Sequence, residues 1–322
     1  MYNILVTGVG AIIGYGIIKS LRKSKYKVNI IGIDIYEDAV GQHWCDHFER
    51  GILASDPSFS NFLLKIIDKY QIDLVIPGIE QDINRIVKDF EMLKNSNAKF
   101  VLNNFELLNI AEDKWTTRLK MEEHGIRTIP SYIKGKYSEI AEDLGVPMLL
   151  KPRRSYASKG ITEINCEEDF NYWLNKMRDN FMVQRIIGNS SSEFTAGVFV
   201  TNQGDSQKII MQRQLSGEGA TSKAKVIINK ELENEIDRLI TIFKPEGPTN
   251  FQFRYEDGYY YLLEINPRIS SSTSLRTSFG YNEAEMCVEY YLENRSPALR
   301  KLRMGSAVRY IEDWVDYVSD NI

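Results

Sequence analysis

The chain has 322 residues, enough for two domains or for one domain with a large extension. Hydrophobic residues make up 43% and charged residues 26%, and the formal net charge is −4, which argues against a disordered chain and against a nucleic-acid binder. No apolar run reaches about 18 residues and the start lacks a signal-peptide pattern, so we expect a cytoplasmic protein without a membrane span. The widely spaced Cys45, Cys166 and Cys287 favour free thiols over a zinc site or a disulfide framework.

The first third of the chain alternates strand-like and helix-like patterns. The apolar run 4–6 leads into a turn with Gly8, Gly10 and Gly14, a helical pattern over 11–21, and a second apolar run that ends at Asp34. The alternation continues with a predicted helix over 59–70, strand over 73–76, helix over 81–94 and strand over 99–102. It predicts an α/β unit with a mostly parallel sheet and right-handed crossovers.

The glycine-rich turn permits two interpretations. Its spacing is G-x-G-x-x-x-G, which departs from the dinucleotide fingerprint, so a tight strand-to-helix turn is favoured over a bound dinucleotide. Ligands of parallel sheets bind beyond the carboxyl ends of the strands. We therefore expect Gly10, Ala11 and Glu80 to line a substrate crevice, although Glu80 and Asp82 are also suited to capping the helix that follows.

A lysine ends the strand-like segment 145–151, and a polar, basic loop follows it. The ammonium of Lys151 would neutralise phosphate charge, and Ser155 and Ser158 would offer hydroxyl and backbone donors to phosphate oxygens. A solvated basic turn is the alternative.

The segment 250–268 predicts a β-hairpin that carries oxygen ligands. Residues 251–255 alternate as in a strand, Glu256-Asp257-Gly258 is a turn, and 259–265 is the returning strand. Gln252, Glu264 and Asn266 would present oxygens to one place, and such a set suits Mg²⁺. Arg268, two residues on, would hold a phosphoryl oxygen or developing charge.

These residues resemble the ATP-grasp superfamily, and within it the carbamoyl-phosphate-synthase-like group. The matching motifs occur in the family's order, namely Asp113-Lys114, 125–130, 147–152, 182–185, Glu193, 250–252 and 264–268. The resemblance covers nearly the whole chain and implies an α/β class fold, with α+β in its C-terminal part. Residues 1–110 would be a Rossmann-like pre-ATP-grasp domain, and 111–185 and 186–322 would be two subdomains that clamp ATP.

The resemblance also implies roles for particular residues. Lys114 and Lys151 would contact ATP phosphates, Gln184, Arg185 and Ile186 would form the strand against adenine, and Glu193 would hold the ribose. The metal set would be Gln252, Glu264 and Asn266, holding two Mg²⁺ ions that Mn²⁺ is expected to replace, with Glu264 bridging them. Arg268 would touch the transferred phosphoryl group, and Arg213 would precede a substrate-closing loop at 216–221.

Together these features predict an ATP-dependent ligase that forms a C–N bond through an acyl phosphate, from a small-molecule carboxylate and an amine. A carbamoyl phosphate synthase large chain carries two such ligase units, whereas this chain has one. A homodimer is left open, with 314–322 as one candidate contact.

Two alternatives compete with the ligase. A nicotinamide-dependent sugar epimerase or reductase would use the glycine turn and a Tyr-x-x-x-Lys pair, for which Tyr132/Lys136 and Tyr172/Lys176 are the matches. A non-catalytic ATP-binding regulator is the other alternative, and the complete metal set argues against it.

Overall fold

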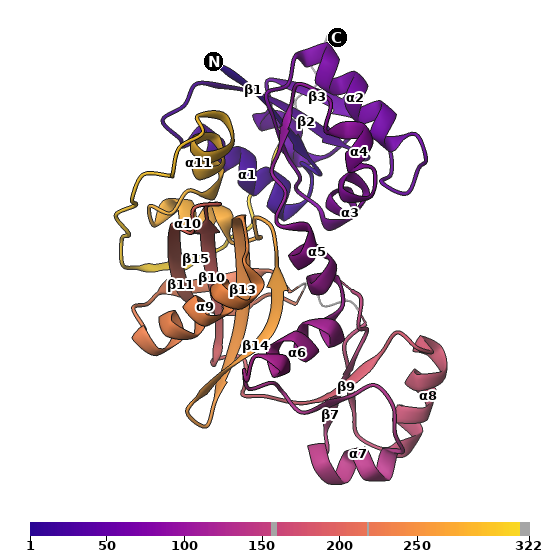
Figure 1. Ribbon diagram of the computed structural model, residues 1–322. Coiled ribbons are helices and arrows are strands. Elements are labelled where there is room, and N and C mark those ends of the chain that lie inside the picture. The colour runs from indigo at the N-terminus through magenta and orange to yellow at the C-terminus, as the bar shows by residue number, and fades with distance from the viewer. Residues whose placement is uncertain (156–159, 218, 316–322) are drawn as a thin grey trace.

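The structure is a computed structural model that describes residues 1–155, 160–217 and 219–315. A parallel sheet, sheet A, forms the upper part of the molecule in Figure 1, with strand order β3-β2-β1-β4-β5. Its strands are β1 (Tyr2–Thr7), β2 (Val28–Asp34), β3 (His47–Arg50), β4 (Leu74–Ile76) and β5 (Lys99–Phe100). The helical segments around it are α1 (Ile12–Arg22), η1 (Val40–Trp44), α2 (Phe59–Tyr70), α3 (Glu80–Lys88) and α4 (Phe90–Leu93). The predicted parallel sheet is confirmed.

Side chains alternate across sheet A because successive residues of a strand point to opposite faces. Ile4 and Val6 of β1 pack in a cluster with α1, whereas Leu5 packs with α2 and α3. One predicted helix is wrong in extent. Residues 81–94 form α3 and α4 rather than one helix, and the break lies at Asp89, whose carboxylate accepts hydrogen bonds from Ser60 and Arg85.

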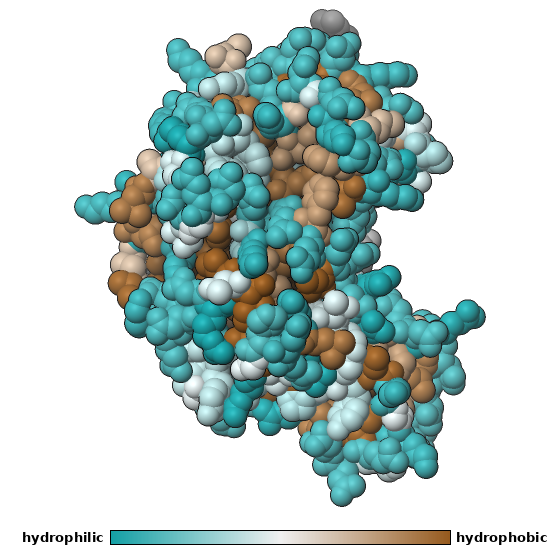
Figure 2. Space-filling view, viewed as in Figure 1, coloured by the Kyte–Doolittle hydropathy of each residue, from teal (hydrophilic) through white to brown (hydrophobic). Residues whose placement is uncertain are grey.

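A small antiparallel sheet, sheet B, projects at the lower right in Figure 1. Helices α5 (Phe105–Glu112) and α6 (Lys114–Glu123) lead to it, and its strand order is β6-β9-β7-β8. Its elements are β6 (Ser131–Tyr132), α7 (Tyr137–Leu144), β7 (Met148–Lys151), β8 (Thr162–Ile164), α8 (Glu167–Met177) and β9 (Met182–Arg185). Figure 2 shows the surface hollowed on the right, between this projection and the sheet A part.

A larger antiparallel sheet, sheet C, occupies the centre, with strand order β14-β13-β10-β11-β12-β15. Its elements are β10 (Glu193–Val200), β11 (Ser206–Leu215), β12 (Thr221–Val226), α9 (Lys230–Phe243), β13 (Gly247–Glu256), β14 (Tyr259–Asn266) and β15 (Ser306–Val308). The predicted hairpin is confirmed as β13 and β14, with Asp257 and Gly258 at positive φ in the turn. One face of sheet C packs against α9, and the other shares a hydrophobic cluster with α1.

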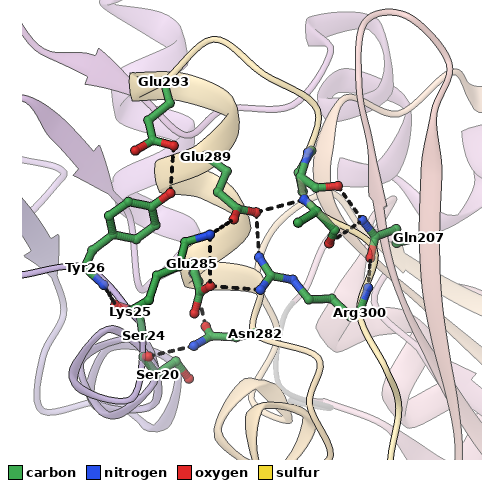
Figure 3. A network of polar contacts seen from close by, with 12 residues as sticks. Ser20, Ser24, Lys25, Tyr26, Gln207, Asn282, Glu285, Glu289, Glu293 and Arg300 are labelled. Atoms are coloured by element: carbon green, nitrogen blue, oxygen red, sulfur yellow. Dashed lines mark hydrogen bonds and ion pairs between the residues drawn. The ribbon is translucent and has the colours of Figure 1, made fainter.

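A polar network centred on the buried carboxylate of Glu289 joins the sheet A part to the chain's C-terminal elements (Figure 3). These elements are α10 (Thr273–Ser278), α11 (Glu283–Cys287) and the π-helical η2 (Val288–Leu292). The fully buried carboxylate of Glu289 accepts from Lys25 Nζ at 2.6 Å, Arg300 Nη2 at 2.5 Å and Arg295 Nη2 at 3.0 Å. Burial raises the pKa of Glu289, but these cations outweigh burial and hold it below its usual range.

Replacing Glu289 by glutamine is therefore expected to lower the free energy of unfolding by about 3–5 kcal/mol, because three cations would lose their shared carboxylate. Glu293→Gln is the matched control, since the side chain of Glu293 is 28% exposed and its loss should lower the free energy of unfolding much less. Urea unfolding measures both. Equal losses in the two variants would contradict this account of the network.

Candidate active site

The hairpin of β13 and β14 brings the three predicted metal ligands together. Gln252 pairs with Glu264 across the hairpin, and Asn266 follows two residues later on the same strand. In this structure Gln252 Oε1 accepts from Arg213 Nη2 at 2.8 Å, and Asn266 Oδ1 accepts from Arg268 Nη2 at 2.8 Å. Glu264 is less engaged, because its nearest cation is Lys114 Nζ at 3.9 Å.

Lys114 reaches this hairpin from the start of α6. Asp113 caps that helix by accepting from the backbone N–H of Trp115 at 2.9 Å, and its carboxylate also pairs with Arg153 at 2.6 Å. The Lys114 backbone N–H donates to the carbonyl of Arg153 at 3.1 Å, which fixes α6 against the end of β7. Lys114 Nζ then donates to the Ser155 carbonyl oxygen at 3.0 Å. The polar loop and α6 therefore form one unit.

Lys151 ends β7 and is buried, as is its partner Gln184 on β9. Its Nζ donates to Gln184 Oε1 at 2.8 Å, and Gln184 Nε2 donates to Ser131 Oγ at 2.9 Å. The pKa of Lys151 is lowered to about 8, mainly by burial and also by the Lys114 charge, against the opposing effect of Glu264. The ammonium is therefore mostly present at neutral pH, and it forms no ion pair with any residue that the structure describes.

A narrow pocket lies between sheets B and C at this point. The two lysines, Gln184 and Glu264 line it, with apolar walls from Met182, Leu262 and Ile265 among others. Cations and one carboxylate thus meet in a cleft between two antiparallel sheets, which suits a polyphosphate and its metal ion.

The adenine and ribose residues predicted from the sequence have defined partners here. The Arg185 backbone N–H donates to the Pro130 carbonyl at 3.1 Å, its side chain pairs with Glu256, and Ile186 is half-buried. Glu193 is buried, and its Oε1 accepts from Arg213 Nη2 at 2.8 Å while Oε2 lies 3.3 Å from Arg254 Nη2. A ribose at Glu193 would have to share a carboxylate that two arginines already bind.

Arg213 and Arg254 join the hairpin to β10 and β11. Burial lowers the pKa of Arg213, and Glu193 opposes that shift. Arg254 was not among the predicted site residues, although its spacing from Gln252 places both side chains on one face of the strand. The pairing with Glu193 had no local signal, since it links strands far apart in the sequence.

Arg268 links the hairpin to sheet A. Its Nη2 donates to Glu80 Oε2 at 3.2 Å as well as to Asn266, and its buried Nε has no hydrogen-bond partner in the described structure. A guanidinium N–H without a protein partner is suited to an anion. Ser158 lies outside the described residues, as does Glu218 within the loop 216–221.

The glycine-rich turn lines a cavity over sheet A, and its backbone is held by contacts with other protein groups. Asp34 Oδ2 accepts from the Gly10 backbone N–H at 2.8 Å, and a Cβ on Gly8 (φ +62°) would lie 2.6 Å from the Ile79 side chain. The Asp34 carboxylate thus occupies the position where a pyrophosphate would be expected, which disfavours a dinucleotide there. Glu80 and Asp82 lie in the first turn of α3, but the capping residue is Ile79, whose side chain makes no cap bond.

The Tyr-x-x-x-Lys pairs are also poorly placed. Tyr132 lies in the short strand β6 rather than in a helix, and Tyr172 on α8 is 60% exposed with Lys176 beside its ring. Neither pair lines the pockets described here.

Three comparisons bear on this arrangement. Residues 178–314 match the family model described as "ATP-grasp in the biosynthetic pathway with Ter operon". Two solved structures share the fold. N5-carboxyaminoimidazole synthetase from Staphylococcus aureus in complex with ADP has a TM-score of 0.73 and 17% identity, and the match covers 94% of this chain and 80% of that one. A biotin carboxylase complex from Campylobacter jejuni has a TM-score of 0.76 and 15% identity, and the match covers 94% of this chain and 74% of that one.

The chain has the ATP-grasp fold.

Curated relatives of this ATP-grasp chain include carbamoyl phosphate synthase large chains. The N-terminal section of the Aquifex aeolicus protein is 23% identical over 82% of this chain, and the Methanosphaerula palustris protein is 20% identical over 82%. The matched regions span only 52% and 27% of those proteins. Across the residues that the structure describes, every helix is too short or too polar to span a bilayer.

The ATP-grasp donor set fits Mg²⁺ only together with a nucleotide. No group of three or more His, Cys, Asp or Glu residues in the described parts of the chain is arranged to hold a metal alone. Glu264 supplies one carboxylate and Gln252 and Asn266 supply amide oxygens, and Mg²⁺ commonly takes one or two carboxylates with phosphate oxygens.

Proposed function

We propose that this chain is an ATP-dependent ligase that activates a carboxylate as an acyl phosphate and transfers the acyl group to an amine. The observation that supports it best is the meeting of Lys114, Lys151 and Glu264 between two antiparallel sheets of an ATP-grasp fold. A binding protein could use the lysines alone, but a carboxylate facing them suits a metal-assisted phosphoryl transfer.

In this proposal the cleft holds ATP between residues 111–185 and 186–322. Lys151 and Lys114 neutralise the phosphates, with Ser155 beside Lys114, while the backbone of Gln184 to Ile186 flanks the adenine. Ser158 is expected to add a phosphate contact. Glu264, with Gln252 and Asn266, would hold Mg²⁺, and the ion would supply positive charge at the phosphate oxygens. To bind the ribose, Glu193 would have to release one of its two arginine partners. Its contact with Arg213 gives it a second role, which is to orient that arginine.

The chemistry has two steps. A carboxylate oxygen of the first substrate attacks the γ-phosphorus, so that an O–P bond forms, the bond to the β-phosphate oxygen breaks, and ADP leaves. The amine nitrogen then attacks the acyl carbon, a C–N bond forms, the C–O bond to phosphate breaks, and phosphate and a proton are released. Arg268, beside the sheet A crevice, would hold the phosphoryl oxygens of the acyl phosphate.

The test is release of ADP and phosphate from Mg²⁺-ATP by the purified chain, across a panel of carboxylates with and without amines. Release that requires one carboxylate–amine pair is the expected result. Tight Mg²⁺-ATP binding with no release for any pair would favour the non-catalytic regulator, and hydride transfer with NAD(P)H would favour the reductase.

A further inference from the structure

The largest cavity described in this chain lies away from the ATP cleft, over the carboxyl ends of sheet A. Its volume is about 610 Å³, enough for a molecule the size of many cofactors. It is bounded by the Gly8–Ala11 turn, the end of β2, the segment 51–55 and the start of α3. Ile35, Ile52, Leu53 and Phe59 contribute apolar walls, so an apolar ligand body would be stabilised there.

The charged residues of this cavity all have one sign. Asp34, Asp38 and Asp82 line it, and the described lining residues include no lysine, arginine or histidine. Asp34 and Asp82 are 8% and 5% exposed, and among the described residues neither takes part in an ion pair. Burial of a carboxylate without a cation is costly, so a positively charged ligand would offset that cost.

The contacts of these two acids make the negative charge a fixed feature of the cavity. Asp34 accepts from the backbone N–H groups of Gly10 at 2.8 Å and Tyr36 at 3.0 Å, which hold its carboxylate at the cavity wall. The pKa of Asp82 is raised to about 6, mainly by burial and also by the charge of Asp34, against the opposing effect of the Thr7 hydroxyl. Asp82 is therefore mostly ionised at neutral pH, and its charge would repel an anionic ligand.

The cavity adjoins the proposed transfer site through the first turn of α3. Ile79, Gln81 and Asp82 line the cavity, whereas Glu80 between them accepts from Arg268. The first turn of α3 therefore separates a ligand in the cavity from Arg268, the residue that we place at the acyl phosphate.

We propose that this cavity binds an amine with an apolar body, its ammonium directed at Asp34 and Asp82, and that it excludes phosphorylated and carboxylate ligands. The role of this amine as the second substrate rests on the proposed function. The binding of an amine in the cavity does not depend on that function.

The test is isothermal titration calorimetry of the full chain at neutral pH with three probes of similar shape: 2-phenylethylamine, 2-phenylethanol and 3-phenylpropanoate. The amine is expected to bind at least about tenfold more tightly than the alcohol, and the carboxylate more weakly than either. Asp82→Asn should lower the amine affinity about tenfold and leave that of the alcohol unchanged, which also shows that the cavity has kept its shape. Asp38→Asn is the matched control, because Asp38 is exposed at the rim and should change the amine affinity less than about twofold.

Equal or tighter binding of the carboxylate, no binding of the amine in the millimolar range, or an unchanged amine affinity in Asp82→Asn would each overturn the inference. A parallel titration with Mg²⁺-ATP separates it from the proposed function. ATP binding without amine binding overturns only the cavity assignment. Amine binding without ATP binding supports the cavity assignment and contradicts the proposed ligase function.

Discussion

Replacing Glu264 by alanine is expected to lower ATP turnover by about a hundred- to a thousandfold. Glu264 is the only carboxylate in the predicted metal set, so its loss would leave two amide oxygens, which are weak Mg²⁺ ligands without it. The fold should tolerate the change. The side chain is 28% exposed, and its nearest cation is 3.9 Å away, so the free energy of unfolding should change by about 1 kcal/mol or less.

The measurements are steady-state ADP release and urea unfolding of the same preparations. Glu264→Gln should lose activity to a similar degree, since it keeps the shape and removes the charge. Glu163→Ala, an exposed glutamate on β8, is the control and should keep full turnover. Full activity in Glu264→Ala would remove the metal assignment, and a large loss of stability would assign Glu264 a structural role instead.

Replacing Lys151 by methionine should have the second largest effect on ATP use. The ammonium lies 2.8 Å from Gln184 Oε1 and forms no ion pair with a described residue. The ATP phosphates would therefore be its negatively charged partner. Its removal should lower ATP affinity about ten- to a hundredfold, the usual loss for a hydrogen bond to a charged group. The free energy of unfolding should change little, because two effects oppose each other. Methionine removes the cost of burying a charge, but it leaves the Gln184 oxygen without a hydrogen-bond donor.

ATP titration calorimetry and thermal unfolding measure these quantities, with Lys225→Met on the exposed side of β12 as the control. A pH effect accompanies this prediction. Because burial lowers the Lys151 pKa to about 8, the ammonium loses its proton as the pH rises through that value, and ATP affinity should fall there in the wild type but not in Lys151→Met. Unchanged ATP affinity in the variant at neutral pH would contradict the phosphate assignment.

Most of the framework could be predicted from local patterns in the sequence. The strands at Ile4 and Val28 and the helix over 59–70 follow from apolar periodicity, and the hairpin of β13 and β14 follows from alternation around Asp257-Gly258. The set Gln252, Glu264 and Asn266 was likewise accessible, because hairpin register brings these positions together.

The remaining features depend on contacts between distant parts of the chain. No periodicity indicates that Asp34 turns back to the Gly10 N–H, that Lys151 binds Gln184, or that Glu193 is shared by Arg213 and Arg254. The break at Asp89 was missed for the same reason, since Ser60 binds its carboxylate from another helix. The large cavity over sheet A is lined by four separate segments of the chain. The charge of its lining could not be predicted, because the lining residues are known only once the fold is known.

The central claim, activation of a carboxylate as an acyl phosphate, is tested most directly by trapping with hydroxylamine. The chain is incubated with Mg²⁺-ATP, hydroxylamine and each carboxylate of the panel, and hydroxamate, ADP and pyrophosphate are measured together. We predict that one class of carboxylate gives hydroxamate and ADP in equal amounts, with no pyrophosphate, and that Glu264→Ala gives neither product. Hydroxamate accompanied by AMP and pyrophosphate would indicate an acyl adenylate and would contradict the account, as would a chain that binds no ATP.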